Sequence, residues 1–536
     1  MTTEDPGRSE TAAAAATQSE GLGEHLGPDG LGHPRRNLIL VIMCLCLVLV
    51  VAAVSSLNVA IPTIVRALDP SSTQQLWIID AYALVFAGLL LLAGALGDRY
   101  GRRHALIIGL VIFGGVSILA AYATDANQLI TYRAIMGIGA ALMMPATLST
   151  LTVVFAPKDR AKAIAIWAGF AGAGAAIGPV ASGLLLEEFW WGSVFFITVP
   201  IALIALVAII AVVPNSADQD KHPLDYVGAA LSVVALVALV FAIIEGPEIG
   251  WLDPVTMASF VVAIGAGFAY LRWERSVEHP LLDPKFFRIP RFGLGSLTIT
   301  VTFLAMFGMF FLLTLYLQFV LGYSPLGAAV RLLPFSVVMI ALAPRNPQLV
   351  KRFGTRQVVA TGFFIQSIGF GLATLLDVDT SYWQILLTVI PLAAGMALLM
   401  PPTTNAIVTS LPENKAGVAS AVNDTTREVG GAIGIALLGT LVTVSYQSGM
   451  TGATDGLAPP LAELAEDSIG GAFRVAAQLD PAVAGPLIQT ANRAFVDGTR
   501  VSFAVAAALG LVMAVIIGRF YPDDEETTDE TMASTP

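Results

Sequence analysis

The sequence predicts an all-α protein that crosses a membrane many times. Its 536 residues are 56% hydrophobic and only 12% charged, whereas ordinary soluble domains carry about 25% charged residues. Uncharged apolar runs recur along the chain, and each is long enough to cross a hydrocarbon layer of about 30 Å as a helix of about 20 residues. Three segments of the first half also recur in the second half at nearly one offset. Because no water-soluble core accommodates this composition, the bilayer is the solvent for most of the chain.

Apolar runs bounded by charge, proline and glycine predict fourteen spans. Their approximate limits are 38–62, 76–97, 105–124, 129–153, 163–186, 194–213, 226–245, 255–273, 293–320, 326–344, 358–376, 384–409, 416–446 and 501–521. The first run follows a polar stretch of 37 residues. That stretch is too long for the basic segment of a cleaved signal peptide, so we predict a retained first helix.

Lysine and arginine gather in alternate connections, and this asymmetry predicts the orientation. With the N-terminus inside, the cytoplasmic connections hold Arg99, Arg102, Arg103, Lys158, Arg160, Lys162, Lys221, Arg272, Arg275, Lys285, Arg288, Arg291, Arg345, Lys351, Arg352, Arg356 and Lys415. The outer loops hold Arg66, with Arg331 near an outer helix end. We therefore expect a multi-pass protein of the inner (plasma) membrane whose two termini are cytoplasmic, with 1–37 and the acidic 522–536 as tails.

The remaining composition excludes several classes of function. The net charge is −11 and its acidic excess lies mainly in the tails and one late loop, so nothing indicates a nucleic-acid partner. All five histidines lie in tails or loops, so a proton carried within the membrane must sit on a carboxylate. No nucleophile, histidine cluster or metal-ligand spacing lies in any span. We therefore expect neither an enzyme nor a bound metal or other cofactor.

An internal repeat predicts two parallel halves. The segment 139–147 (GAALMMPAT) recurs at 395–403 (GMALLMPPT), an offset of 256 residues, and 176–178 recurs at 432–434 with the same offset. The pattern Leu-x-x-Arg-(Tyr/Phe)-Gly-x-Arg at 96–103 recurs at 349–356, an offset of 253 residues. Chance similarity among Gly-rich and Ala-rich spans explains any single match but explains the ordered set poorly.

The repeat divides the chain into six-helix halves at 38–213 and 293–521, with two extra central helices at 226–273 between them. These two helices are apolar all round, which favours a lipid-facing position at the periphery, and we assign them no chemistry. A polar loop at 447–500 separates the last two spans. Its helical patterning at 461–478 and around 486–495 predicts short helices on the outer surface.

The most specific motif is GALGDRYGRR, which contains Gly94, Asp98, Arg99, Gly101, Arg102 and Arg103. Its glycines permit a tight turn between two antiparallel helices, and its arginines hold that turn in the cytoplasm. The motif resembles the signature of the major facilitator superfamily between helices 2 and 3, and the match is full. The resemblance implies a conformational latch in which Asp98 and Arg99 bridge to the other half and stabilise the outward-open state.

Two further motifs resemble patterns of the same family. In the fourth span, Arg133 lies in a helix-4 motif that carries Met136 where the family usually has glutamine. An arginine within the membrane either forms a fixed ion pair between helices or tunes a protonating acid, and we favour the second reading. In the fifth span, Gly174, Gly178, Pro179 and Gly183 resemble the family's antiporter motif, with Ser182 in place of a glycine.

Two groups of intramembrane carboxylates are candidates for proton coupling. Trp77, Asp80 and Tyr82 open the second span, and the similar depths of Asp80 and Arg133 predict that these two pair. In the thirteenth span, Asp424 and Glu428 share a helix face, with Arg427 one turn from Asp424. Two close carboxylates raise each other's proton affinity while an arginine opposes that effect. The alternative, a solvated helix start, fits Asp424 but fits Glu428 poorly, because Glu428 lies about twelve residues into the span that begins at 416.

The pattern over 38–521 resembles the fourteen-helix drug/proton antiporter branch of the superfamily. The resemblance implies a multidrug efflux transporter that exchanges small toxic molecules for protons, driven by the proton gradient, with Asn58 in the substrate cavity. Its partners would be small molecules, protons and lipid, and we expect a monomer. The chain carries Ala53 and Met339 where exporters of multivalent cations carry acids. A proton-linked importer or uniporter of a metabolite on the same fold stays an alternative, because fold alone does not decide direction.

Overall fold

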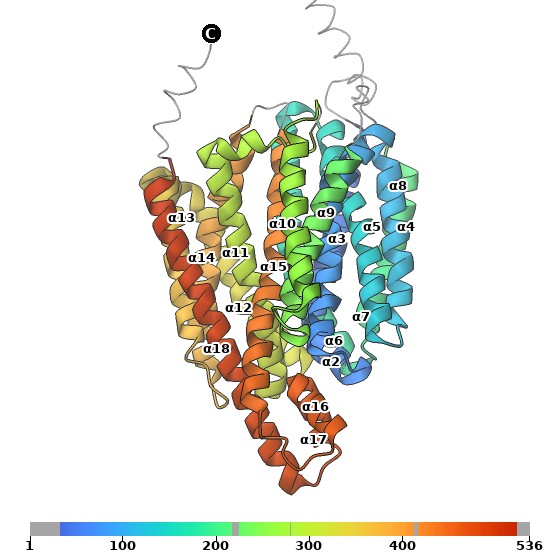
Figure 1. Ribbon diagram of the computed structural model, residues 1–536. Coiled ribbons are helices and arrows are strands. Elements are labelled where there is room, and N and C mark those ends of the chain that lie inside the picture. Colours follow the sequence, from blue (N-terminus) through green and yellow to red (C-terminus); the bar gives the residue numbers. More distant parts are fainter. Residues whose placement is uncertain (1–32, 217–224, 279, 412–415, 523–536) are drawn as a thin grey trace, which may run out of the picture.

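The computed structural model describes residues 33–216, 225–278, 280–411 and 416–522. The expected tails at 1–32 and 523–536 lie outside these ranges. The described chain forms a bundle of long helices that run from one end to the other (Figure 1). We call the end at which α2 begins and α18 finishes the basic end, since Arg36, Arg102 and Arg356 lie there, and the other the α16–α17 end.

The helices fall into three groups along the chain. The first half contains α2 (Arg36–Leu68), α3 (Ser72–Tyr100), α4 (Arg102–Ala121), α5 (Ala126–Val154), α6 (Pro157–Glu188), α7 (Ser193–Phe196) and α8 (Thr198–Val212). Next come α9 (Tyr226–Ile249) and α10 (Pro254–Glu274). The second half contains α11 (Pro290–Leu315), which ends in a π turn at Tyr316–Val320, α12 (Pro325–Leu342), α13 (Asn346–Ala373), α14 (Tyr382–Thr409), α15 (Ala416–Met450), α16 (Pro459–Asp467), α17 (Ile469–Ala476) and α18 (Pro481–Phe520).

Long helices lie at each of the fourteen predicted segments, which confirms the all-α membrane class. Among the described residues, twelve helical stretches are long and apolar enough to cross a membrane. One of them, Pro325–Ala373, contains both α12 and α13, and α6 is not among the twelve. The number of spans therefore stays a prediction.

The internal repeat corresponds to equivalent helix packing in the two halves. A Cβ on Gly139 of α5 would lie 2.8 Å from the carbonyl oxygen of Gly109 on α4. A Cβ on Gly395 of α14 would lie 2.7 Å from the carbonyl oxygen of Gly362 on α13. Both pairs of helices therefore touch backbone to backbone, which only glycine allows at these positions.

The second repeated pattern forms matching turns at the basic end. Gly101 and Gly354 both have positive φ, 107° and 78°, a conformation that glycine adopts without strain. The following arginines then reach the last helix of their own half. Arg103 donates to the carbonyl of Ile210 at 2.7 Å, and Arg356 donates to the carbonyl of Gly518 at 2.7 Å.

The halves meet closely at the α16–α17 end. Gln318 of the π turn donates to the carbonyl of Val59 on α2 at 2.9 Å. On another side of the bundle, Gly183 of α6 leaves space for the backbone of Leu326 on α12, which a Cβ would approach to 2.7 Å. The structure is therefore closed between its halves at this end.

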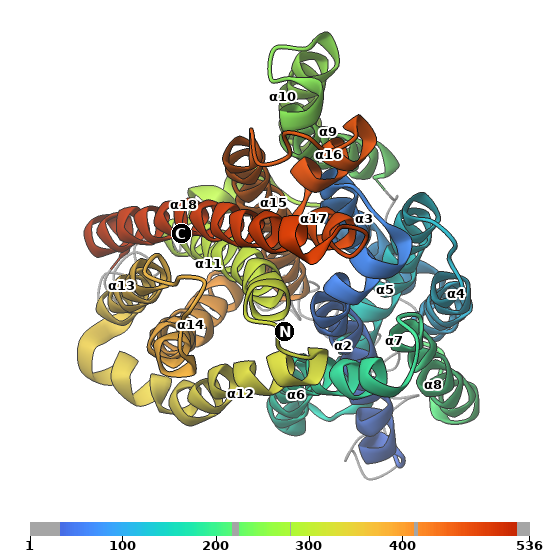
Figure 2. The ribbon, with the colours of Figure 1, turned by 90° about the horizontal axis from the view of Figure 1, so that it is seen from below.

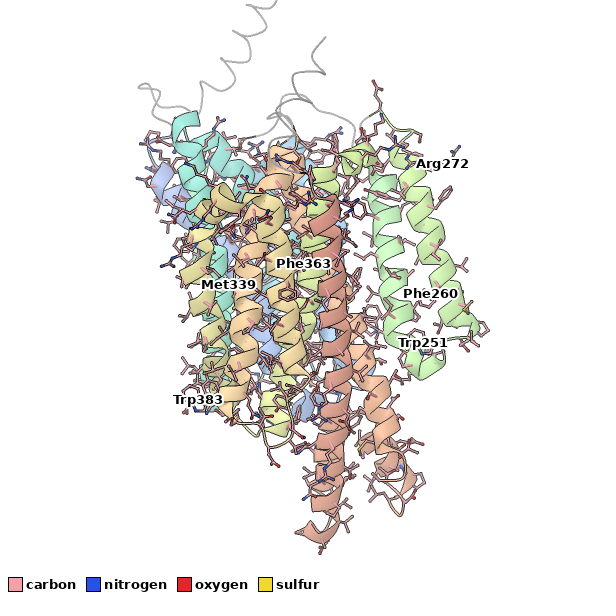
Figure 3. All side chains as sticks on the ribbon, turned by 90° about the vertical axis from the view of Figure 1, so that its left-hand side faces the viewer. Trp251, Phe260, Arg272, Met339, Phe363 and Trp383 are labelled. Carbon is pink, nitrogen blue, oxygen red and sulfur yellow. The ribbon has the colours of Figure 1, made fainter. Side chains whose placement is uncertain are left out.

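The two extra helices occupy different environments. Helix α10 packs on α9 and exposes much of its apolar surface, with Phe268 70% and Ile264 72% exposed. Helix α9 instead packs against both α3 and α15, one from each half (Figure 2). Figure 3 shows α10 on the outer side of α9. The expectation that both helices face lipid is therefore wrong for α9, which packs on the seam between the two halves, where α3 meets α15. An apolar helix surface packs against protein as well as against lipid.

The late loop is shorter than the sequence suggests. Helix α15 continues to Met450 and α18 begins at Pro481, so the segment expected as a separate short helix around 486–495 is the first part of α18. This polar extension is supported by α15, since Gly449 lies against Ala494. The expected loop 447–500 thus reduces to 451–480, which contains α16 and α17.

The short helices α16 and α17 dock on both halves. Asp467 accepts hydrogen bonds from the backbone nitrogen and hydroxyl of Ser72, at 2.9 and 3.0 Å, and Arg474 forms an ion pair with Asp69. Phe473 packs on Phe319 of the second half, with ring centroids 5.4 Å apart. Burial raises the pKa of Asp467 above its ordinary value, against the opposing effect of the bonds from Ser72.

We expect this docking to tighten as the solution at the α16–α17 end is acidified. The pKa of Asp467 is higher when docked than in a detached loop, so the docked form binds the proton more tightly. Docking is therefore favoured as the pH falls through the raised pKa toward the ordinary value of about 3.9. Distances between spin labels on Ala477→Cys and Thr124→Cys, both exposed sites, measure the docked fraction. Asp467→Asn should remove the pH response; an unchanged response in that variant would contradict the assignment.

Candidate transport site

A charged cluster occupies the buried part of α15. Arg427 lies between two carboxylates, with Nη2 3.6 Å from Asp424 and Nε 3.3 Å from Glu428. The side chain of Glu428 is 7% exposed, and its Oε2 has no hydrogen-bond partner among the described residues. Arg427 also lies 5.7 Å from the ring of Phe303 on α11. The predicted i, i+3 and i, i+4 arrangement is therefore present, with the arginine shared by both acids.

A second charge is buried in the first half. Arg133 of α5 is fully buried, and its Nε donates to the carbonyl of Ile78 on α3 at 3.1 Å. Its guanidinium carbon lies 4.4 Å from the centre of the Tyr82 ring, a cation–π contact. Neither terminal nitrogen of Arg133 has a hydrogen-bond partner within the described chain. The side chain of Arg133 is therefore held by the hydrogen bond of its Nε and by the Tyr82 ring, not by an anion.

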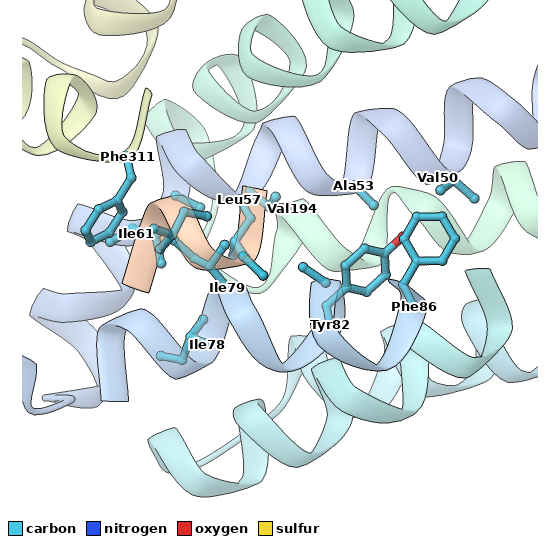
Figure 4. Close-up of a cluster of buried hydrophobic side chains, with 14 of the residues drawn as sticks. Val50, Ala53, Leu57, Ile61, Ile78, Ile79, Tyr82, Phe86, Val194 and Phe311 are labelled. Carbon is cyan, nitrogen blue, oxygen red and sulfur yellow. The ribbon is translucent and has the colours of Figure 1, made fainter. Parts of the chain in front are cut away.

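Tyr82 lies within electrostatic range of both charged groups. It interacts electrostatically with Arg133 of its own half and with Arg427 and Glu428 of the other half. Figure 4 shows its ring beside Phe86, with both side chains directed toward Ala53 of α2. Tyr82 therefore lies close to Ala53. Ala53 is the position at which exporters of multivalent cations carry an acid.

The predicted pair between Asp80 and Arg133 does not form. Asp80 is fully buried, and neither carboxylate oxygen has a partner among the residues that the structure describes. Asp80 and Tyr82 are two residues apart, so they point about 200° apart around α3. Because Arg133 contacts the Tyr82 side of α3, it cannot reach Asp80. Equal depth in the membrane was the basis of the prediction, and depth does not specify the helix face.

The other expected cavity residues divide between the two sides of α3. Trp77 donates its Nε1 proton to Glu245 of α9 at 2.8 Å, away from Tyr82. Asn58 lies on α2, and its side-chain oxygen is buried without a partner within the described chain. The sequence analysis did not single out Glu245, because it lies near the end of a helix that is otherwise apolar. The sequence does contain a signal, because Glu245 and Glu248 are two acids three residues apart in an otherwise apolar helix.

Asp98 of the expected latch forms an ion pair within its own half. Asp98 forms a 2.9 Å ion pair with Arg102, and Arg102 donates to the carbonyl of Ser149 at 3.2 Å. Gly94 lies against Pro145 of α5, while Arg99 lies 5.6 Å from the ring of Tyr100. This arrangement suits a structure whose halves are closed at the opposite end.

The glycine motif of α6 serves two interfaces. A Cβ on Gly178 would lie 2.8 Å from the carbonyl oxygen of Ala52, so Gly178 allows close packing on α2, and Gly174 lies against the same helix. Gly183 faces α12 of the other half, and Pro179 lies between these contacts within the helix. Ser182, which departs from the family pattern, donates to the carbonyl of Ser56 on α2 at 3.0 Å. The departure therefore adds a bond at an interface that the glycines already form.

We expect Arg133→Met to raise the thermal stability of the purified protein. Methionine keeps most of the buried volume, and it removes a cation whose terminal nitrogens lack partners in this structure. Replacement of buried ion pairs by apolar residues has stabilised proteins by about 1–4 kcal/mol. Melting followed by intrinsic fluorescence in detergent measures the effect. Arg133→Ala should lower the thermal stability, because it also leaves a cavity. A clearly lower thermal stability of Arg133→Met would contradict the prediction and would mean that the bonds of Arg133 stabilise the fold.

Comparison with known proteins agrees with the architecture. A family model for the Major Facilitator Superfamily matches residues 43–435. The Multidrug efflux pump LfrA of Mycolicibacterium smegmatis is 37% identical over 480 residues, which covers 89% of this chain and 95% of that protein. The Methyl viologen resistance protein SmvA of Salmonella typhimurium is 33% identical over 487 residues, which covers 90% of this chain and 97% of that protein.

Solved structures show the same fold at low sequence identity. A POT family transporter in complex with 5-aminolevulinic acid superposes with a TM-score of 0.64 at 16% identity, covering 93% of this chain and 98% of that one. The family match, the two relatives and the repeated six-helix packing agree. The chain is a multi-pass membrane protein that belongs to the Major Facilitator Superfamily.

Proposed function

We propose that this protein is a proton-coupled antiporter that exports small, amphipathic toxic molecules by alternating access. The observation that carries the proposal is the buried charged cluster on α15, in which Arg427 lies between Asp424 and Glu428 and the second carboxylate oxygen of Glu428 has no partner within the described chain. A carboxylate buried in this way is sensitive to any change in the seam. The names of the relatives LfrA and SmvA, an efflux pump and a resistance protein, support export as the direction.

Glu428 is the proposed coupling group, and the reason is its solvation. A buried carboxylate is costly when ionised unless it is paired, so Glu428 alternates between a protonated form and a form that needs Arg427. A cationic substrate bound beside Glu428 would compete with the proton for the same carboxylate. Asp424, with a side chain 17% exposed, shares Arg427 and modulates this competition.

The state closed at the α16–α17 end would be the one that accepts substrate from the cytoplasm. The basic residues at the other end support a cytoplasmic location for both termini and an inner (plasma) membrane location. When the halves rock, the basic end closes, and Asp98 with Arg99 would then bridge to the second half as the latch. The gradient of protons across the membrane supplies the driving force, and a monomer contains both halves of the site.

An importer or uniporter on the same fold is the alternative. Inverted membrane vesicles separate the two, because an exporter accumulates its substrate in them when their interior is acidified. Radiolabelled tetraphenylphosphonium, a lipophilic monovalent cation, is a suitable first probe. Uptake into intact cells that depends on the protein, with none into acidified inverted vesicles, would support the alternative.

We expect monovalent cations to be transported much faster than divalent ones. The chain has Ala53 and Met339 where exporters of multivalent cations carry acids, so fewer carboxylates are available to balance a second charge. Parallel assays in proteoliposomes, one with tetraphenylphosphonium and one with methyl viologen, measure the ratio of the two transport rates. Ala53→Asp should raise the methyl viologen rate, whereas equal rates for the two probes in the unaltered protein would contradict the charge argument.

We expect Glu428→Gln to uncouple transport from the pH gradient. The amide fixes the neutral form with nearly unchanged shape, so substrate binding should survive while proton release is lost. Proton release on addition of tetraphenylphosphonium to the purified protein measures the coupling. Asp424→Asn should have the smaller effect, because Asp424 is nearer to solvent. If both variants release protons as the unaltered protein does, the cluster on α15 is structural.

A further inference from the structure

The carboxylates on α9 lie against the face of α3 that carries Asp80. Glu245 accepts from Trp77 at 2.8 Å, and Glu248 accepts from the hydroxyl of Thr73 at 3.1 Å. Further along, a Cβ on Gly88 would lie 2.6 Å from the side chain of Val233, so α9 follows the same face of α3 toward the basic end. Two side-chain hydrogen bonds and one close backbone approach therefore fix α9 to α3.

Asp80 belongs to this same face. At 100° per residue, positions 73, 77, 80, 84 and 88 of a helix lie within about 80° of one another. Three of these five positions contact α9 directly, at Thr73, Trp77 and Gly88. The carboxylate of Asp80 is fully buried and has no partner within the described chain. Helix α9 therefore covers Asp80 on the side that would otherwise face lipid.

Helix α15 closes the other edge of this junction. Leu76 of α3 packs on Gly439 of α15, whose Cβ would approach its side chain to 2.4 Å, and the hydroxyl of Thr440 donates to the carbonyl of Ile243 on α9 at 3.1 Å. Asp80 thus lies at the junction of α3, α9 and α15. The contact between Leu76 and Gly439 covers it on the side of the α16–α17 end. If the halves separate at this end and the bonds from Trp77 and Thr73 keep α9 on α3, the bond from Thr440 of α15 to α9 must break.

We propose that Glu245 is the outer proton relay that serves Asp80, a role that rests on the proposed proton coupling. On opening at the α16–α17 end, the Glu245 carboxylate takes a proton from solution, and the resulting carboxyl group passes it to the Asp80 carboxylate, which restores the Glu245 carboxylate. Trp77 has only a donor proton, so it orients Glu245 and does not carry the proton. Trp77 and Asp80 differ by about 4.5 Å along the helix axis, so the carboxylate that Trp77 binds lies on the same face of α3 and toward the α16–α17 end from Asp80.

The charged residues that the helices around Glu245 contribute are acids. Helix α3 contributes Asp80, and α9 contributes Glu248, which interacts electrostatically with Asp467 of α16. Helix α10 contributes Asp253 at its N-terminus. Helix α15 has no charged residue between Glu428 and its end at Met450, only the titratable Tyr446, whose hydroxyl donates to the carbonyl of Ala465.

The test compares Glu245→Gln with the unaltered full-length protein in proteoliposomes. One measurement is tetraphenylphosphonium transport driven by acid on the α16–α17 side, and the other is exchange of labelled for unlabelled probe without a pH gradient. We expect the driven rate to fall by about a hundredfold, the low end of what a positioned proton-transfer group contributes. Exchange should stay close to that of the unaltered protein, because it needs binding and rocking but no net proton movement.

Three variants control the interpretation. Glu245→Asp should restore much of the driven rate, and Trp77→Phe should give an intermediate rate, since it removes only the orienting bond. Glu463→Gln, an exposed acid on α16 at the same end, should behave as the unaltered protein does.

Each remaining outcome overturns a specific claim. Equal loss of driven transport and exchange in Glu245→Gln would mean that the residue only anchors α9. An unchanged driven rate would remove the relay and leave proton coupling intact. Absence of driven transport in the unaltered protein would instead overturn the proposed antiport, and the relay with it.

Discussion

The contact between α3 and α15 joins the two halves of the molecule, and the buried charges of these two helices lie on either side of it. On one side of α3, the contact brings Tyr82 with its stacked Arg133 toward Arg427 and Glu428. On the other side of α3, the same contact places Leu76 against Gly439 of α15 and so covers Asp80. Ionised groups are costly in such surroundings unless they are paired. A small separation of these two helices therefore changes the solvation of several charges at once, which is the physical requirement for coupling a proton to a conformational change.

The two insertions that distinguish this chain from a plain pair of six-helix halves meet at one turn of α3. Asp467 of α16 binds Ser72, and Glu248 of α9 binds the adjacent Thr73. Both contacts lie at the N-terminus of α3, where free backbone N–H groups favour acidic partners. The first turn of α3 is therefore held by a helix pair from the second half and by the central helix α9. Movement of α3 at this end must rearrange one or both of these contacts.

Symmetry and asymmetry have separate roles in this fold. The repeated glycines make α4–α5 and α13–α14 equivalent close-packed pairs, and the repeated arginines tie each half to its own last helix. These contacts keep each half rigid. The acidic groups, in contrast, are not repeated: Asp80 lies in the first half and Glu428 in the second. Rigid halves with unequal charges suit a mechanism in which the seam moves and the halves do not deform.

The sequence by itself determined the membrane class, the positions of the long helices, the repeat and the cluster on α15, because hydrophobic runs and spacing within one helix are local properties. Only the tertiary structure decided which helix each face meets. It separated Asp80 from Arg133, placed α9 in the seam and joined the expected outer helix near Pro486 to α18. Helix periodicity gives the angle between two side chains on one helix. The neighbour at that angle depends on how the two halves pack, and no short stretch of sequence encodes that arrangement.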